Sequence, residues 1–232
     1  MTRTALILGA TGLVGGHCLR LALASQAYHE VRVLTRRPVS HEDARLRQAI
    51  IDPQQLEQHR DWFQVDDLFC ALGTTLKRAG SREAFRRVDE ELVVRAAHLA
   101  VEAGVQRCIV VSAANARARS PFFYARVKGE MEQRLEALRL PMLAFMQPSL
   151  LLGERSEVRR AEALGARLSN VLRPVTRWTN ADWLPVQASQ VARAMVGMAL
   201  VGPSTGTYRV RYRDFPVFAG ELEHQYPQSI QS

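Results

Sequence analysis

The chain has 232 residues, of which 47% are hydrophobic and 23% charged, and this composition is typical of one compact globular domain. No stretch reaches the ~18 consecutive apolar residues of a membrane span, so we expect no stable membrane insertion. The net charge of +8 raises the question of a nucleic-acid partner. The basic residues are scattered and almost all are arginine, which favours a solvated surface and no nucleic-acid binding.

The first predicted element is Ala5–Leu8, an apolar run without alternation, as in a central parallel strand buried on both faces. Gly9, Gly12 and Gly15 follow at a spacing of three residues, before an amphipathic helix. Gly9 permits a sharp turn, Gly12 lets backbone N–H groups approach a pyrophosphate, and Gly15 lets the helix pack close to the strand. This predicts a dinucleotide site at a helix N-terminus; a purely structural turn is the alternative.

The same N-terminal stretch has a superficial likeness to a signal peptide, because Arg3 precedes an apolar run. Glycines, His17 and Arg20 interrupt that run, and export would remove the glycine loop. We therefore expect a cytoplasmic protein. The three cysteines are odd in number, lack metal-ligand spacing, and fall on the first helix and two buried strands, where cysteine acts as a small hydrophobe. They are Cys18, Cys70 and Cys108.

Strands and helices alternate along the rest of the chain. Further strands are predicted at Val31–Thr35, Arg47–Ile51, Asp67–Leu72, Arg107–Ser112, Met142–Met146 and Gly206–Val210, and helices at Ser81–Ala103, Phe122–Leu138, Glu154–Arg177 and Ser189–Leu200. The tail Glu221–Ser232 has little apolar content, so we expect it to fray. The alternation predicts an α/β fold with a doubly wound parallel sheet of the Rossmann type. We expect a single domain over residues 1–232, to which 153–206 contribute a small substrate-side lobe.

The end of the second strand predicts the choice of coenzyme. An acid there would accept a hydrogen bond from the ribose 2′-hydroxyl of NAD, whereas arginine suits the 2′-phosphate of NADP. The sequence has Arg36 and Arg37 at this place and no acid between Val31 and His41. Because two guanidinium groups can clamp a phosphate, we predict NADP(H) as the cofactor; arginines that merely end a surface strand are the alternative.

Tyr124 and Lys128 carry the predicted chemistry. Four residues apart on a helix, they lie on one face about one turn apart. An ammonium group beside a phenol lowers its pKa, so Tyr124 could protonate a carbonyl oxygen or remove the proton in reverse. Lysine is rare in this chain: only Lys77 and Lys128 among 31 basic residues are lysines.

With these features the sequence resembles the atypical, NAD(P)-binding short-chain dehydrogenases/reductases. Within them it is most similar to the group of the Tat-interacting tumour-suppressor oxidoreductase and its bacterial relatives. The matching pieces are Gly9–Gly15, Arg36–Arg37, Phe69–Thr75, Ala79–Gly80, Val88–Asp89, Ser112, Phe123–Tyr124, Val127–Glu130 and Pro148–Gly153.

The resemblance implies that Tyr124 is the acid/base, that Lys128 binds the nicotinamide ribose and lowers the tyrosine pKa, and that Ser112 hydrogen-bonds the substrate oxygen. It also implies that Asp52 meets the adenine amino group and that Pro148 abuts the nicotinamide. The expected cofactor-binding residues are Gly9, Thr11, Gly12, Leu13, Val14, Arg36, Arg37, Asp52, Leu72, Gly73, Thr74, Lys128 and Pro148.

Two residues depart from the family pattern: Ala113 and Ala114 follow Ser112 where many relatives have further serines, and Gln147 stands where an arginine often precedes the proline. The favoured function is hydride transfer between NADP(H) and a small carbonyl or alcohol. An NADPH-binding regulator and an isomerase or epimerase are the alternatives, the last ranked lowest because little sequence remains for a sugar-nucleotide lobe. The expected partner is a small-molecule substrate, and a homodimer is possible. Substrate-side residues are expected in 116–123, 150–160 and 178–184.

Overall fold

The computed structural model describes residues 3–152 and 185–227. Seven parallel strands form one sheet in the order β3-β2-β1-β4-β5-β6-β9, which confirms the doubly wound sheet predicted from the sequence. The strands are β1 (Arg3–Leu8), β2 (Tyr28–Thr35), β3 (Leu46–Ile50), β4 (Asp67–Cys70), β5 (Arg107–Val111), β6 (Met142–Gln147) and β9 (Gly206–Arg211). A separate parallel pair joins β7 (Leu151–Leu152) to β8 (Val186–Gln187).

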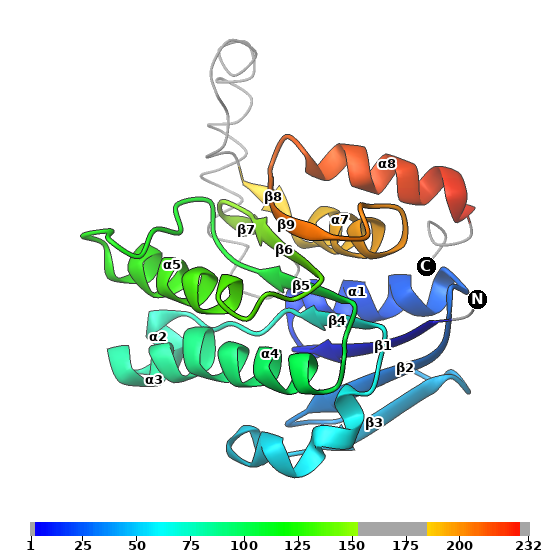
Figure 1. Ribbon diagram of the computed structural model, residues 1–232, viewed down its shortest axis with the longest axis horizontal. Coiled ribbons are helices and arrows are strands. Elements are labelled where there is room, and N and C mark those ends of the chain that lie inside the picture. The colour runs from blue at the N-terminus through cyan, green and yellow to red at the C-terminus, as the bar shows by residue number, and fades with distance from the viewer. Residues whose placement is uncertain (1–2, 153–184, 228–232) are drawn as a thin grey trace.

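Helices cover both faces of the sheet (Figure 1). On one face lie α1 (Leu13–Ala24), α7 (Ala188–Leu200) and α8 (Phe215–Gln225). The other face carries the 3-10 segment η1 (Pro53–Phe63), α4 (Leu92–Glu102) and α5 (Phe123–Glu136). The short helices α2 (Leu76–Ala79) and α3 (Arg82–Arg86) lead from β4 through one π-helical turn, η2 (Arg87–Glu91), into α4.

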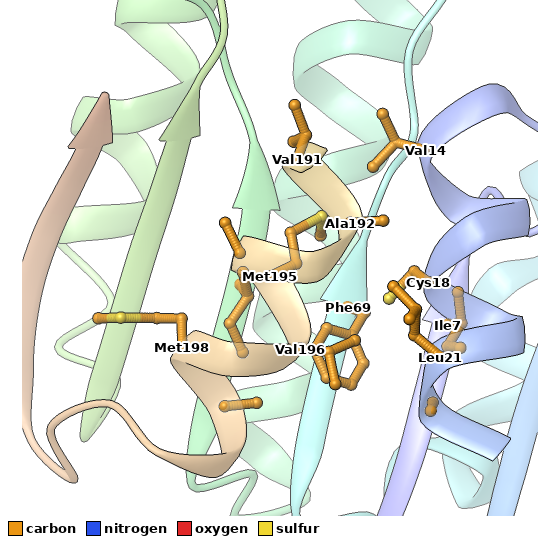
Figure 2. Packing of buried hydrophobic residues seen from close by; sticks show 14 of the residues in the cluster. Ile7, Val14, Cys18, Leu21, Phe69, Val191, Ala192, Met195, Val196 and Met198 are labelled. Carbon is orange, nitrogen blue, oxygen red and sulfur yellow. The ribbon is translucent and has the colours of Figure 1, made fainter. Parts of the chain in front are cut away.

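The central strands are buried on both sides, which explains their unbroken apolar sequence. On β1, Ala5, Leu6, Ile7 and Leu8 are at most 2% exposed, and Ile7 faces one core cluster while Leu6 faces the other. Figure 2 shows the first cluster, where Met195 and Val196 of α7 pack beside α1. The strands therefore form a rigid frame whose carboxyl ends position the loops.

Several boundaries differ from the sequence prediction. The helix expected at 81–103 is divided into α3, η2 and α4, since the π-helical turn interrupts regular winding. The tail expected to fray contains the end of α8, because Leu222 is completely buried against the first cluster. The segment η1 was not predicted; its N-cap is Asp52, whose carboxylate accepts a hydrogen bond from the Gln54 N–H.

The region expected to form the substrate-side lobe lies partly outside the described residues. The helix predicted at Glu154–Arg177 falls there entirely. Of the remainder, β8 pairs with β7, and α7 packs against α1 as part of the main helix layer. The three cysteines are buried on α1, β4 and β5, as predicted, and burial raises the pKa of the Cys70 thiol to about 11.

Candidate cofactor and catalytic site

A pocket of about 400 Å³ opens at the carboxyl ends of β1, β2 and β4. This edge of an open parallel sheet is where ligands of doubly wound folds bind. The glycine loop, the end of β2 and the loop after β4 line the pocket, together with η1 and η2. Predicted residues in its lining are Gly9, Thr11, Gly12, Arg36, Arg37, Leu72, Gly73 and Thr74.

The glycine loop is as tight as the motif predicts. Gly9 has a φ of +84°, and a Cβ on it would lie 2.5 Å from the Ala71 carbonyl oxygen at the end of β4. A Cβ on Gly15 would lie 2.2 Å from the Gly9 carbonyl oxygen, so α1 can begin directly against the loop only with glycine there. Gly12 is the N-cap of α1, and no acidic side chain occupies its first turn.

This cradle fits the pyrophosphate of a dinucleotide. The first N–H groups of a helix have no partner within the helix, and the positive end of its dipole favours an anion. Thr11 and Gly12 line the pocket immediately before these groups. A Cβ on Gly12 would lie 3.0 Å from the Gly9 carbonyl oxygen, a tight contact that favours glycine at this position.

Arg36 and Arg37 lie on the rim of the same pocket, where β2 ends. The Thr35 hydroxyl donates to the Arg37 carbonyl at 2.9 Å and so fixes the backbone of this turn. Neither guanidinium group forms an ion pair with another described residue, and no described carboxylate lines the pocket. The pocket therefore combines phosphate-binding cations with the apolar side chains of Leu34 and Leu56, a surface suited to an adenine ring.

Five predicted cofactor residues do not line this pocket: Leu13, Val14, Asp52, Lys128 and Pro148. The carboxylate of Asp52 caps η1, although its neighbours Ile51 and Pro53 line the pocket. Val14 is buried in the core beside α7, so its contribution to a ligand is limited to its backbone. Pro148 is buried, and its carbonyl accepts from the Ala114 N–H, which ties together the loops after β5 and β6.

The catalytic candidates lie on α5, next to the loop after β4. The Lys128 ammonium is buried and lies 2.8 Å from Asp89 Oδ1 and 3.5 Å from the Val111 carbonyl oxygen. Asp89, in the π-helical turn, also accepts from the Thr74 N–H at 2.8 Å. Asp89 therefore connects Lys128 directly to a loop that lines the cofactor pocket.

Tyr124 lies one turn before Lys128, as predicted. Its ring packs on Phe85, with ring centroids 5.7 Å apart, while the residue as a whole is 44% exposed. The predicted lowering of its pKa is wrong in sign: burial raises the pKa of Tyr124, Lys128 lowers it and Asp89 raises it, so that the net pKa lies above the ordinary value. The Asp89 carboxylate offsets much of the effect of the Lys128 charge on the Tyr124 phenol, and the spacing of Tyr124 and Lys128 does not reveal this carboxylate.

Lys128 itself stays charged. Burial lowers the pKa of its ammonium, but the Asp89 carboxylate raises it, and the net pKa lies above the ordinary value. A buried lysine is protonated only when such a partner compensates for its lost hydration. Lys128 therefore remains a protonated hydrogen-bond donor one turn from Tyr124 on the same helix.

Ser112 lies at the end of β5, as predicted, but its hydroxyl donates to Glu132 of α5. Glu132 is buried and also accepts from Gln147 Nε2 at 2.9 Å and from Arg209 Nε at 3.2 Å. A hydroxyl has a single hydrogen, so Ser112 in this arrangement can only accept a further hydrogen bond. Among the described residues, Gln147 Oε1 has no partner, which indicates that the amide is oriented by its donors to Glu132.

Sequence reasoning missed the roles of Asp89, Glu132 and Arg209. Asp89 had a detectable signal, because it is an acid on the otherwise apolar stripe of the predicted helix 81–103. Glu132 continues the four-residue spacing of Tyr124 and Lys128, so its position on the same helix face was also readable. Arg209 had none, since only the sheet order brings β9 beside β6.

Substrate-side predictions are only partly covered. Phe122, in the expected stretch 116–123, is 75% exposed, and Leu150 is 63% exposed. The ranges 153–160 and 178–184 lie outside the described residues. In the part of the chain that the structure describes, no helix is long and apolar enough to cross a membrane, and no cluster of His, Cys, Asp and Glu side chains could hold a metal ion.

Comparisons with known proteins agree with this geometry. Residues 9–184 match the model of a family described as NAD(P)H-binding. Protein HTATIP2 of Rattus norvegicus is 33% identical over 208 residues, covering 88% of this chain and 84% of the relative. Protein FMP52, mitochondrial, of Candida albicans is 31% identical over 209 residues, covering 84% of this chain and 87% of the relative.

Solved structures share the fold at lower sequence identity. MoeE5 in complex with UDP-glucose and NAD has a TM-score of 0.65 at 17% identity, covering 95% of this chain and 82% of that protein. The Bordetella bronchiseptica enzyme WbmG in complex with NAD and UDP has a TM-score of 0.66 at 17% identity, covering 96% and 79%. At this level of identity the likeness establishes the Rossmann fold alone.

Proposed function

Because this chain belongs to the NAD(P)H-binding family, as an atypical short-chain dehydrogenase/reductase, we propose that it is an NADP(H)-dependent oxidoreductase acting on a small carbonyl or alcohol. The observation that carries the proposal is the continuous connection from the pocket loop through Asp89 to the Lys128 ammonium, with Tyr124 one turn away on the same helix. A cofactor-binding scaffold without chemistry has no need for a buried cation beside a phenol.

The coenzyme-binding groups would be the N-terminus of α1 and the glycine loop for the pyrophosphate, and the apolar slot near Leu34 for the adenine. Lys128, which is connected to the pocket loop through Asp89, would bind the nicotinamide ribose. A nicotinamide coenzyme, when bound, supplies the hydride chemistry that no amino-acid side chain provides. Arg36 and Arg37 support NADP(H) over NAD(H), since the β2 terminus carries two cations and the described pocket lining contains no carboxylate.

The chain's own chemical contribution is a proton held at Tyr124 Oη. A phenol is protonated near neutral pH, and the raised pKa of Tyr124 does not change this, so its proton is available for a carbonyl oxygen. Lys128 stabilises the phenolate left after that donation, and Asp89 keeps Lys128 in place. Ser112, whose hydroxyl donates to Glu132, would accept a hydrogen bond from an alcohol substrate or from Tyr124. This arrangement favours carbonyl reduction near neutral pH.

The test begins with fluorescence titrations of the purified protein with NADPH and NADH. A panel of aldehydes and ketones is then screened by following NADPH absorbance. Tyr124→Phe should retain NADPH binding within about twofold and lose at least about 100-fold in turnover, the usual contribution of a general acid. Undiminished turnover by Tyr124→Phe would refute the assigned mechanism, and failure to retain either coenzyme at micromolar concentration would refute the proposal itself.

An NADPH-binding regulator with little turnover is the second candidate function. The observation in its favour is that Lys128 and Ser112 are both engaged with carboxylates of the protein. Tight NADPH binding combined with silence across the whole carbonyl panel would favour the regulator. We also propose a cytoplasmic location; because the FMP52 relative is named as mitochondrial, cell fractionation with markers for both compartments is the test.

A further inference from the structure

Two further arginines in the pocket lining have no role in the sequence motifs. Arg78, in α2, and Arg87, in the π-helical turn, line the same pocket as Arg36 and Arg37. Four guanidinium groups from three separate segments therefore surround one cavity of about 400 Å³, and no described carboxylate lines it. The groups are exposed at the rim, where a highly anionic ligand would meet them.

The neighbouring arginines show that this placement is selective. Arg86 forms ion pairs with Glu90 and Glu130, and the guanidinium carbon of Arg82 lies 5.2 Å from the centre of the Phe123 ring. Arg78 and Arg87 form no ion pair with the residues that the structure describes. The segment between β4 and α4 thus engages two of its arginines internally and leaves two on the pocket.

Local structure holds these two residues in place. The Thr75 side chain caps α2 by accepting from the Arg78 N–H at 3.2 Å, and α2 ends at Gly80, whose φ is +81°. Arg87 precedes the buried Asp89, which is bound to Thr74 of the same loop. The charge of Arg87 also acts on the exposed carboxylate of Glu83. Arg78 is therefore the arginine more available to an anionic ligand.

We propose that Arg78 and Arg87 form the second half of a phosphate clamp, which binds the 2′-phosphate of NADP(H) together with Arg36 and Arg37 of the same pocket. This proposal rests on the proposed coenzyme and adds the residues that set its specificity. A phosphomonoester carries close to two negative charges at neutral pH and offers three acceptor oxygens, so several guanidinium groups can bind it together. The ribose hydroxyl of NAD(H) provides no such charge and gains little from Arg78 or Arg87.

The experiment measures dissociation constants rather than turnover. NADPH and NADH are titrated into wild type and four variants: Arg78→Gln, Arg87→Gln, Arg36→Gln/Arg37→Gln and the control Arg60→Gln. For each protein, competition by adenosine 2′,5′-bisphosphate is compared with competition by ADP. Arg60 is an exposed arginine on η1 that does not line the pocket. Thermal unfolding of each variant checks that it is folded, and Arg78→Lys provides a variant that keeps the charge but loses the planar donor fork.

Arg78→Gln should weaken NADPH and the 2′,5′-bisphosphate by about 5- to 10-fold while changing NADH and ADP by less than about twofold, as expected for charged contacts at a partly exposed rim. Arg87→Gln should have a smaller effect of the same kind, and Arg78→Lys should be intermediate. The salt dependence of NADPH binding should also become shallower in Arg78→Gln.

The proposal is overturned if Arg78→Gln and Arg87→Gln weaken NADPH and NADH equally, or if neither differs from Arg60→Gln. Failure of the proposed function gives a different result, because wild type would then retain neither coenzyme. A wild type that binds NADPH, with selectivity lost only in Arg36→Gln/Arg37→Gln, would limit the clamp to Arg36 and Arg37.

Discussion

Replacing Asp89 with alanine should strongly destabilise the folded protein, because it leaves the Lys128 ammonium buried without its carboxylate partner. Both side chains are at most 3% exposed, and their charged atoms are 2.8 Å apart. Breaking a buried pair from one side costs ~3–5 kcal/mol, and the Thr74 N–H loses its acceptor for about 1 kcal/mol more. We therefore expect Asp89→Ala to lower the free energy of unfolding by about 4–6 kcal/mol, a large share of a typical total.

The assay is urea unfolding followed by circular dichroism at neutral pH. The control is Glu57→Gln, which breaks the ion pair between Glu57 and Arg95. The side chain of Arg95 is 36% exposed and that of Glu57 is 47% exposed. An exposed pair is worth ~0.2–1 kcal/mol, so the control should differ little from wild type. The double variant Asp89→Leu/Lys128→Met removes both charges together and should recover most of the loss.

The reasoning fails if Asp89→Ala lies within about 1 kcal/mol of Glu57→Gln, since such a result would mean that water reaches the buried pair. It also fails if the double variant is no more stable than Asp89→Ala. The slope of unfolding against urea should stay constant across the series, because a changed slope would indicate an altered unfolded state rather than a lost ion pair.

Three further predictions concern the glycine loop, the buried polar network and pH. Gly15→Ala places a Cβ 2.2 Å from a backbone carbonyl oxygen of the loop and should abolish NADPH binding in a titration. In the control Gly220→Ala, no atom lies within 4 Å of the added Cβ, so this variant should stabilise α8 by up to about 1 kcal/mol in urea unfolding. Ser112→Ala removes one of several donors to a buried carboxylate and should cost about 1–2 kcal/mol in the same assay with NADPH affinity unchanged; a cost near zero would contradict the network. Burial raises the pKa of Asp67, so the folded state binds its proton more tightly than the unfolded state. The stabilisation from this group is complete below the unfolded pKa of about 3.9 and is lost as pH rises through the raised value. Wild type measured against Asp67→Asn by thermal unfolding should therefore lose relative stability as the pH rises above about pH 4.

The sequence was sufficient for the sheet and the glycine loop because both obey local rules. Central parallel strands lack polar alternation, and Gly9 and Gly15 stand where no Cβ fits. The spacing of Tyr124 and Lys128 correctly predicted a shared helix face, but the sign of the pKa shift depends on burial and on Asp89 from another element. Likewise, Leu222 looked isolated in a polar tail, and only the packing of α8 on the core explains its burial.

One face of α5 carries Tyr124 and Lys128 together with two glutamates. The four-residue spacing of these side chains explains how the catalytic residues are held in place. At successive four-residue steps this face presents Tyr124, Lys128, Glu132 and Glu136, of which Lys128 binds the η2 turn. Glu132 binds the edge of the sheet through donors from β5, β6 and β9, so the helix cannot rotate without breaking several buried hydrogen bonds. The rotation of α5, and with it the direction of Tyr124, is fixed from both ends of this face.

The buried network around Glu132 explains why an amide suits position 147. Arg209, from β9, already supplies a guanidinium group that binds Glu132 and, at 2.5 Å, Glu136. A second arginine would add another cation to be desolvated beside a carboxylate that is already paired, whereas an amide adds donors without charge. The cost is an unpaired carbonyl oxygen on Gln147, and a buried polar atom of this kind is retained only where its other half makes contacts of greater value.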